Sequence, residues 1–216
     1  MNIVLLGPPG AGKGTQGERI ARRFEVPKLA TGDVLREAVR AGTTLGCQAK
    51  SFMERGDLVP DEVILGIMKE AVGRPEAARG VVLDGVVRTV PQAEGLERMM
   101  NELHRTVDAV LLLEVDEDEL VRRISARTVC EGCQTPYTGC EPGAACEKCG
   151  GRLVRRKDDE PEAVRRRMRA YREQTAPVVD WYRRRSQKQP GPRFVEVDAV
   201  GDVDEVTQRV LSALNR

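Results

Sequence analysis

A glycine-rich loop with one lysine lies near the beginning of the chain: Gly7-Pro8-Pro9-Gly10-Ala11-Gly12-Lys13-Gly14-Thr15. It follows a short apolar run and precedes a segment of helical character, which is the setting of a P-loop. Backbone amides that glycines leave accessible can hold a phosphate at a helix N-terminus, and the lysine adds positive charge. We therefore expect six residues of this loop to bind a nucleoside triphosphate: Gly10, Ala11, Gly12, Lys13, Gly14 and Thr15. A glycine-rich turn without a ligand is the alternative.

An aspartate that could orient a magnesium ion follows a second apolar run. Asp84 comes directly after Val81-Val82-Leu83, so it should lie at the carboxyl end of a strand, facing the phosphate loop. There it can orient Mg²⁺ through water. Gly14 stands where a P-loop usually carries a magnesium-binding Ser or Thr, so we do not expect Thr15 to bind the ion directly. A turn or capping aspartate is the alternative for Asp84.

Two Cys-x-x-Cys pairs, Cys130 with Cys133 and Cys146 with Cys149, are separated by 12 residues. This doubled spacing predicts a tetrahedral site of four thiolates. Such a site leaves no position open to water, so we expect a structural metal, and zinc is the expected ion. Iron or cobalt and a redox-active disulfide are the alternatives. The surrounding segment has almost no aliphatic residues, so the metal should supply folding free energy.

Short aliphatic runs alternate with longer segments of helical spacing along most of the chain. The runs lie at residues 2–6, 81–83, 109–113 and 194–197. This alternation is typical of an α/β fold with a parallel sheet. Apolar residues at helical spacing predict a final amphipathic helix, and these are Val203, Val206, Val210, Leu211 and Leu214. Two stretches, about 31–60 and 129–151, interrupt the alternation.

The composition is that of a soluble globular chain with one core domain. The 216 residues carry a formal net charge of +1, so no overall field attracts nucleic acid or membranes. No run approaches the roughly 18 apolar residues of a membrane span, and the few aromatic residues leave little for base stacking. We expect a cytoplasmic protein without nucleic-acid or membrane partners. Six cysteines in such a chain favour metal binding or burial over disulfides.

Several further segments form a specific combination with the phosphate loop. They are TGDVLR at 31–36, GDLVPDE at 56–62, LDG at 83–85 with Arg88, Thr89 and Gln92, RKDD at 156–159 and RRR at 165–167. Together these segments resemble the adenylate kinase family over essentially the whole chain. The resemblance implies reversible phosphoryl transfer from Mg·ATP to AMP, giving two ADP, by a monomer that serves adenine nucleotide homeostasis.

The resemblance also implies an architecture. The fold would be an α/β fold of the P-loop NTPase type, with a parallel sheet of about five strands flanked by helices and two mobile insertions. The core domain would comprise residues 1–29, 60–121 and 160–216. An AMP-binding insertion would occupy residues 30–59, and a lid with the four-cysteine site would occupy residues 122–159.

Site residues are implied by their match to the family motifs. Those implied in AMP binding are Thr31, Arg36, Asp57, Leu58, Val59, Gly85, Val86, Val87, Arg88, Gln92, Arg156 and Arg167. Those implied in ATP binding beyond the phosphate loop are Arg123, Arg127, Pro136, Tyr137 and Gly201. The implied catalytic residues are Lys13, Asp84, Arg88, Arg127, Arg156 and Arg167. Converging cations suit a reaction between two polyanions, and closure of the segments that carry them would exclude water.

Two departures from the family pattern affect these expectations. Val86-Val87 stands where the family usually has Phe-Pro. Because a non-proline cis bond costs about 2.5 to 4 kcal/mol, we expect a trans peptide here, a slightly reshaped loop and weaker AMP binding. The lid also lacks most of the usual aromatic segment after its first cysteine pair, of which Tyr137 remains.

Three other functions remain as alternatives. The first is a nucleoside monophosphate kinase for UMP, CMP or GMP, although Thr31 and Gln92 favour adenine by the resemblance. The second is a zinc-ribbon protein that binds nucleic acid, which the near-zero net charge and the few aromatic residues disfavour. The third is a nucleotide-binding scaffold, which requires that the change at Val86-Val87 has disabled AMP binding.

Overall fold

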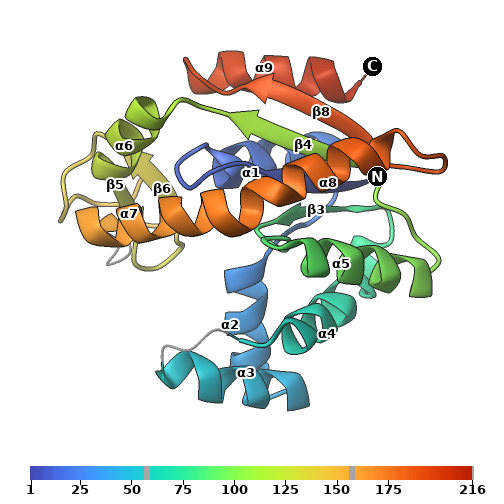
Figure 1. The fold of residues 1–216 in the computed structure, drawn as a ribbon. Helices are drawn as coiled ribbons and strands as arrows, with labels where there is room; N and C mark the ends of the chain where they lie inside the picture. The colour runs from blue at the N-terminus through green and yellow to red at the C-terminus, as the bar shows by residue number, and fades with distance from the viewer. Residues whose placement is uncertain (56–58, 156–158, 216) are drawn as a thin grey trace.

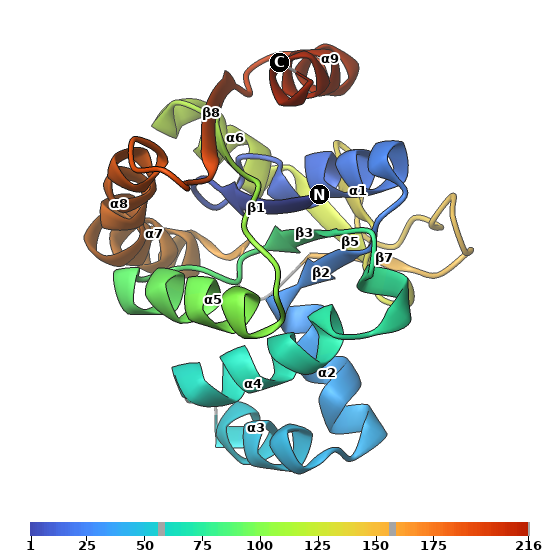
Figure 2. The same ribbon diagram turned by 90° about the vertical axis from the view of Figure 1, so that its right-hand side faces the viewer.

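The computed structural model describes residues 1–55, 59–155 and 159–215. Five parallel strands form its central sheet, and they are β1 (Asn2–Leu6), β2 (Lys28–Ala30), β3 (Val81–Asp84), β4 (Ala109–Glu114) and β8 (Arg193–Asp198). Their order is β2-β3-β1-β4-β8, so the first strand lies at the centre (Figures 1 and 2). The predicted α/β fold with a parallel sheet of about five strands is confirmed.

Both faces of this sheet are covered, which explains why its three inner strands β1, β3 and β4 are continuous apolar runs. All five residues of β1 are buried. Ile3 and Leu5 contribute to one core cluster, whereas Val4 and Leu6 contribute to the other, because successive side chains of a strand point to opposite faces. Helices on the two faces complete these clusters, as expected for a parallel sheet.

The helices divide between the two clusters. Those that pack with Ile3 and Leu5 are α1 (Lys13–Phe24), α6 (Glu117–Ser125), α7 (Pro161–Ala170) and α9 (Val203–Leu214). Those that pack with Val4 and Leu6 include α4 (Asp61–Val72), α5 (Val90–Glu102) and α8 (Ala176–Ser186). A 3₁₀ turn, η1 (Pro75–Ala77), precedes β3, and a π-helical turn, η3 (Tyr171–Thr175), joins α7 to α8. The predicted C-terminal amphipathic helix is therefore α9.

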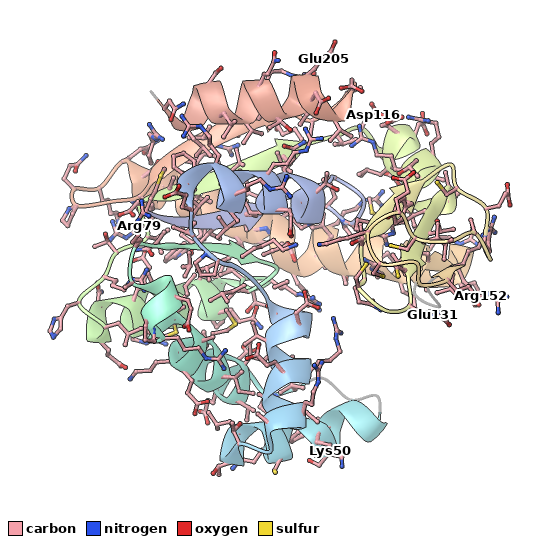
Figure 3. All side chains as sticks on the ribbon, turned by 180° about the vertical axis from the view of Figure 1, so that it is seen from behind. Lys50, Arg79, Asp116, Glu131, Arg152 and Glu205 are labelled. Carbon is pink, nitrogen blue, oxygen red and sulfur yellow. The ribbon has the colours of Figure 1, made fainter. Side chains whose placement is uncertain are left out.

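Two helices extend away from the sheet and form what we call the α2–α3 arm: α2 (Thr31–Ala41) and α3 (Thr44–Arg55) (Figures 1 and 2). The turn between them contains Gly42, whose φ of 67° is in the left-handed region. A Cβ at Gly46 would overlap the carbonyl oxygen of Ala38, so glycine permits the close approach of the two helices. Lys50 of the arm and Glu205 of α9 lie at opposite ends of the molecule (Figure 3).

A second, three-stranded antiparallel sheet forms what we call the cysteine-rich segment. Its strands are β5 (Arg127–Cys130), β6 (Pro136–Thr138) and β7 (Leu153–Val154), with β5 in the middle. Its buried cluster consists of Cys130, Cys146 and Leu153, which is too small to be a hydrophobic core. Within the described ranges, no helix has the length and apolar character that crossing a membrane requires.

Candidate active site

The glycine-rich loop lies between the carboxyl end of β1 and the first residue of α1. Gly7, Gly10 and Gly12 have φ values of 142°, 85° and 90°, a region that other residues adopt only under strain. A Cβ at Gly10 would lie 2.8 Å from Cγ1 of Ile124, so packing also requires glycine there. The first turn of α1 has no acidic residue. The positive end of the helix dipole and the backbone amides therefore form a site suited to an anion.

Lys13, the first residue of α1, folds back over this loop. Its ammonium donates hydrogen bonds to the carbonyl oxygens of Gly7, at 2.6 Å, and Pro8, at 2.8 Å. Burial lowers the pKa of Lys13 to about 8; Asp84 opposes this shift, whereas the charges of Arg167, Arg88 and Arg127 reinforce it. The Lys13 charge is therefore held in a partly dehydrated and positive environment, where a phosphate would stabilise it.

Three arginines from separate parts of the chain converge on Lys13. Arg88 follows β3, Arg127 begins β5 and Arg167 lies in α7, and the charge of each acts on Lys13. The pKa of Arg88 is lowered, first by the loss of hydration around its guanidinium and then by the positive charge of Arg167. Like charges repel one another, so a cluster of this kind is favourable when a polyanion lies among them.

Asp84 supplies the negative charge beside these cations. It is the last residue of β3 and pairs in register with Leu5 of β1, which places it at the sheet edge that carries the phosphate loop. A Cβ at Gly14 would lie 3.8 Å from Oδ2 of Asp84. The position that carries Ser or Thr in most P-loops is thus adjacent to a carboxylate. A carboxylate is the oxygen ligand that Mg²⁺ prefers, so the residues present fit the predicted magnesium role of Asp84.

A second contact brings together two residues predicted to bind the base of ATP. Arg123 in α6 donates to the carbonyl oxygen of Ala199 at 2.8 Å and to Glu119 Oε1 at 2.7 Å. Ala199 begins the loop that contains Gly201, whose φ is 113°. Arg123 and the Gly201 loop therefore lie side by side, although their contact with a base stays a prediction.

The residues predicted to bind AMP group around Gly85. The Thr31 hydroxyl, at the start of α2, donates to the Gly85 carbonyl oxygen at 2.9 Å. Gln92 is buried, and its side chain accepts a hydrogen bond from the backbone N–H of Arg88 at 2.7 Å. Arg36, by contrast, pairs with Asp33 on its own helix, in the α2–α3 arm. The structure thus joins Thr31, Gly85, Arg88 and Gln92, whereas Arg36 lies further along the same helix as Thr31 and pairs within that helix.

Val86 and Val87 are 2% and 3% exposed and pack into the core. Within the described ranges the one cis peptide bond is Gln189–Pro190, so the predicted trans peptide at these valines is confirmed.

Three of the predicted site residues, Asp57, Leu58 and Arg156, lie outside the described residues. Val59, at the boundary, is partly buried against the core, and its role stays a prediction.

The four predicted metal ligands form one cluster. Sulfur atoms of Cys130, Cys133, Cys146 and Cys149 all lie within 4.8 Å of one another. The shorter separations, 3.4 Å between Cys130 and Cys149 and 3.5 Å between Cys133 and Cys146, join the two pairs and far exceed a disulfide bond of about 2.05 Å. Tetrahedral zinc would require separations of about 3.8 Å. The donor set therefore fits a tetrahedral metal site.

Side chains around the sulfur atoms complete this site. The Tyr137 hydroxyl lies 3.2 Å from Sγ of Cys146, and Thr135 Oγ1 lies 3.1 Å from Sγ of Cys133. A Cβ at Gly151 would approach Sγ of Cys130 to 2.8 Å. Glu131 and Arg152 lie at the outer edge of the segment (Figure 3). The Tyr137 hydroxyl thus faces the cysteine cluster, and the ATP contacts predicted for Pro136 and Tyr137 stay predictions.

Comparison with known proteins decides the family. The family model for adenylate kinase matches residues 5–187, which is more than half of the chain. The chain belongs to the adenylate kinase family. A relative named adenylate kinase from Gemmatimonas aurantiaca is 64% identical over 216 residues, covering 99% of each chain. Adenylate kinases from Salinispora tropica, at 44% identity over 99% of this chain and 98% of theirs, and Archaeoglobus fulgidus, at 42% over 100% and 99%, are also similar. The resemblance noted in the motifs is thus confirmed.

One further residue of this adenylate kinase family member organises the arginines and had no predicted role. Asp159 is 4% exposed and pairs with both Arg127 and Arg167. Its Oδ2 accepts from Nε of Arg127 at 2.8 Å, and its Oδ1 lies 3.2 Å from Nη1 of Arg167. The RKDD segment was a signal for it in the sequence, but only folding reveals which aspartate holds which arginine.

Proposed function

We propose that this chain transfers the terminal phosphoryl group of Mg·ATP to AMP, reversibly, and forms two ADP. The observation that carries the proposal is the convergence of Lys13, Arg88, Arg127 and Arg167 on one phosphate-binding loop. Transfer between two nucleotides assembles two polyanions, and the reaction needs positioning and charge stabilisation more than it needs proton transfer by a side chain.

The roles of the individual groups follow from their positions. The loop amides and Lys13 would bind the β- and γ-phosphates of ATP. Arg123 and the neighbouring loop that contains Gly201 would bind the adenine of ATP. Arg88 would bind the AMP phosphate on the other side of the transferred group. Arg127 and Arg167, joined by Asp159, would stabilise the negative charge on the phosphoryl group as it moves from ATP to AMP. Mg²⁺ bound to ATP would neutralise phosphate charge, with Asp84 orienting it through water.

Two segments would close over the nucleotides. We propose residues 30–59, which include the α2–α3 arm, as the AMP-binding insertion, and residues 122–159 as the lid. Closure would bring Arg36 and the residues around Val59 toward AMP and exclude water, which would otherwise hydrolyse ATP. The four cysteines would hold a structural zinc ion that stabilises the lid, because this segment has no adequate core of its own.

The reverse reaction and one arginine test this proposal. Given ADP and Mg²⁺ alone, the protein should form ATP and AMP in equal amounts. Arg88→Ala should lower kcat/KM for AMP by about 10²-fold or more while the KM for Mg·ATP changes by less than about threefold. Arg88→Lys keeps the charge and loses the bidentate geometry. Its kcat/KM for AMP should therefore lie between the values of the wild type and Arg88→Ala. ADP that yields no ATP would contradict the proposal.

A further inference from the structure

Gln92 is held by two different groups at the two ends of its side-chain amide. Its Oε1 accepts from the backbone N–H of Arg88 at 2.7 Å, and its Nε2 donates to Oδ1 of Asp61 at 2.6 Å. Its own backbone N–H donates to the hydroxyl of Thr89, which caps α5. Gln92 is 7% exposed, so these contacts fix the amide in a partly dehydrated position.

The chemistry of these two partners permits one orientation of the amide. A backbone N–H is only a donor, and an ionised carboxylate is only an acceptor. A 180° flip of the Gln92 amide would place its NH₂ group against the N–H of Arg88 and its oxygen against the carboxylate of Asp61. Both contacts would then be repulsive, and buried polar groups without partners are costly.

The locked amide keeps one free N–H and one free oxygen lone pair for a ligand. These complement the Watson–Crick edge of a 6-aminopurine, which offers an acceptor at N1 and a donor at the 6-amino group. A 6-oxopurine offers the reverse, a donor at N1 and an acceptor at the 6-carbonyl. Gln92 could match that edge only by the flip that its two partners oppose.

We infer that Asp61 is a specificity-determining positioning residue for the acceptor nucleotide. It begins α4, which packs beside α5, where Gln92 lies (Figures 1 and 2). Its carboxylate holds Gln92 in the orientation that selects a 6-aminopurine monophosphate over a 6-oxopurine monophosphate. The inference rests on the proposed function, because it assumes that Gln92 reads the base of the acceptor.

We would test this role of Asp61 with the variants Asp61→Ala and Asp61→Asn. The measurement is kcat/KM for AMP and for IMP as acceptors at saturating Mg·ATP. IMP differs from AMP in its 6-oxo group and the N1 proton that accompanies it. Comparing the two acceptors therefore isolates the effect of the Watson–Crick edge of the purine. Asp61→Ala should lower the preference for AMP over IMP, as a ratio of kcat/KM values, by about tenfold, which corresponds to about 1.4 kcal/mol. The change should lie in the KM for AMP, and the KM for Mg·ATP should not move.

Asp61→Asn separates this role from a structural one. An asparagine amide can meet Gln92 in either orientation, so the KM for AMP should rise less than in Asp61→Ala, while IMP becomes a better acceptor than for the wild type. Glu62→Gln is the matched control, since Glu62 is an exposed acid in the same first turn of α4. It should retain the wild-type preference.

The outcomes distinguish this inference from the proposed function. A preference that stays within about twofold of the wild-type value in both Asp61 variants, in an enzyme that phosphorylates AMP, would overturn the inference. A wild-type protein that phosphorylates no monophosphate would overturn the proposed function and this role together. If Asp61→Ala does not fold, the affinities of Asp61→Asn for AMP and IMP, measured by calorimetry, decide the question.

Discussion

The ammonium group of Lys13 lies 2.6 Å from the carbonyl oxygen of Gly7, six residues earlier in the same loop. The lysine is thus held by the backbone of the loop whose amides would bind the phosphate. Its charge is not neutralised by these neutral carbonyl groups. Because burial also lowers its pKa, protonation of Lys13 should be sensitive to pH in the range where the enzyme is assayed.

The first prediction concerns this pH dependence. The pKa of Lys13 is lowered to about 8 by burial, and the protonated form is the one that binds phosphate. As pH rises through about 8, the free enzyme loses this charge, so kcat/KM for Mg·ATP should fall. Bound phosphate raises the pKa, so kcat should fall only at a higher pH. Lys13→Arg, whose charge does not titrate, should show no decrease near pH 8. The same decrease in both proteins would contradict the assignment.

The second prediction concerns Asp159. It is 4% exposed and pairs with Arg127 and Arg167, which are 19% and 33% exposed. Asp159→Asn would leave two arginines repelling each other. We expect a loss of about 2 kcal/mol in the free energy of unfolding, less than for a fully buried pair, and a fall in kcat of at least about tenfold. Denaturant unfolding and initial rates measure the two effects. Unchanged kcat would contradict the proposed positioning of the arginines.

The third prediction separates two glycines of the phosphate loop that have similar φ values, 85° at Gly10 and 90° at Gly12. A Cβ at Gly10 would lie 2.8 Å from Ile124, whereas within the described residues a Cβ at Gly12 would meet no atom within 4 Å apart from its own chain neighbours. Gly10→Ala should therefore lose about 1 to 3 kcal/mol more stability than Gly12→Ala. Gly12→Ala should chiefly raise the KM for Mg·ATP. Equal stability losses in urea would contradict this difference.

The fourth prediction concerns the cysteine cluster. Metal analysis should give about one equivalent of zinc per chain, and a chelator should lower the Tm by about 5 °C or more. Cys149→Ser should lose the metal and show the same decrease. Cys47, exposed on α3, provides the control, because Cys47→Ser should keep both the zinc and the Tm. Protein purified under reducing conditions with zinc supplied, yet metal-free, would contradict the site.

Much of the fold could be predicted because its signals are local. Aliphatic runs mark the buried strands β1, β3 and β4 and the partly buried edge strand β8, and glycines before Lys13 mark the turn into α1. The strand β2 was not predicted. It has only three residues, begins with Lys28 and shows no clear apolar run, and α2 starts at the next residue.

Contacts between distant segments could not be predicted in the same way. The bond between Asp61 and Gln92 joins residues 31 positions apart, and the bond between Asp159 and Arg127 joins residues 32 positions apart. Local propensity carries no information about such pairs. The Cys-x-x-Cys pairs are the exception, since four thiolates that share one metal need a specific spacing.

The most direct test of the proposed activity is ADP formation by the purified protein from Mg·ATP with AMP, GMP, CMP or UMP, with Mg·ATP alone as the control. We expect rapid turnover with AMP, much slower turnover with the other monophosphates and little ADP from Mg·ATP alone. Equal or faster turnover with another monophosphate, or hydrolysis of ATP that needs no acceptor, would contradict an adenylate kinase activity for this chain.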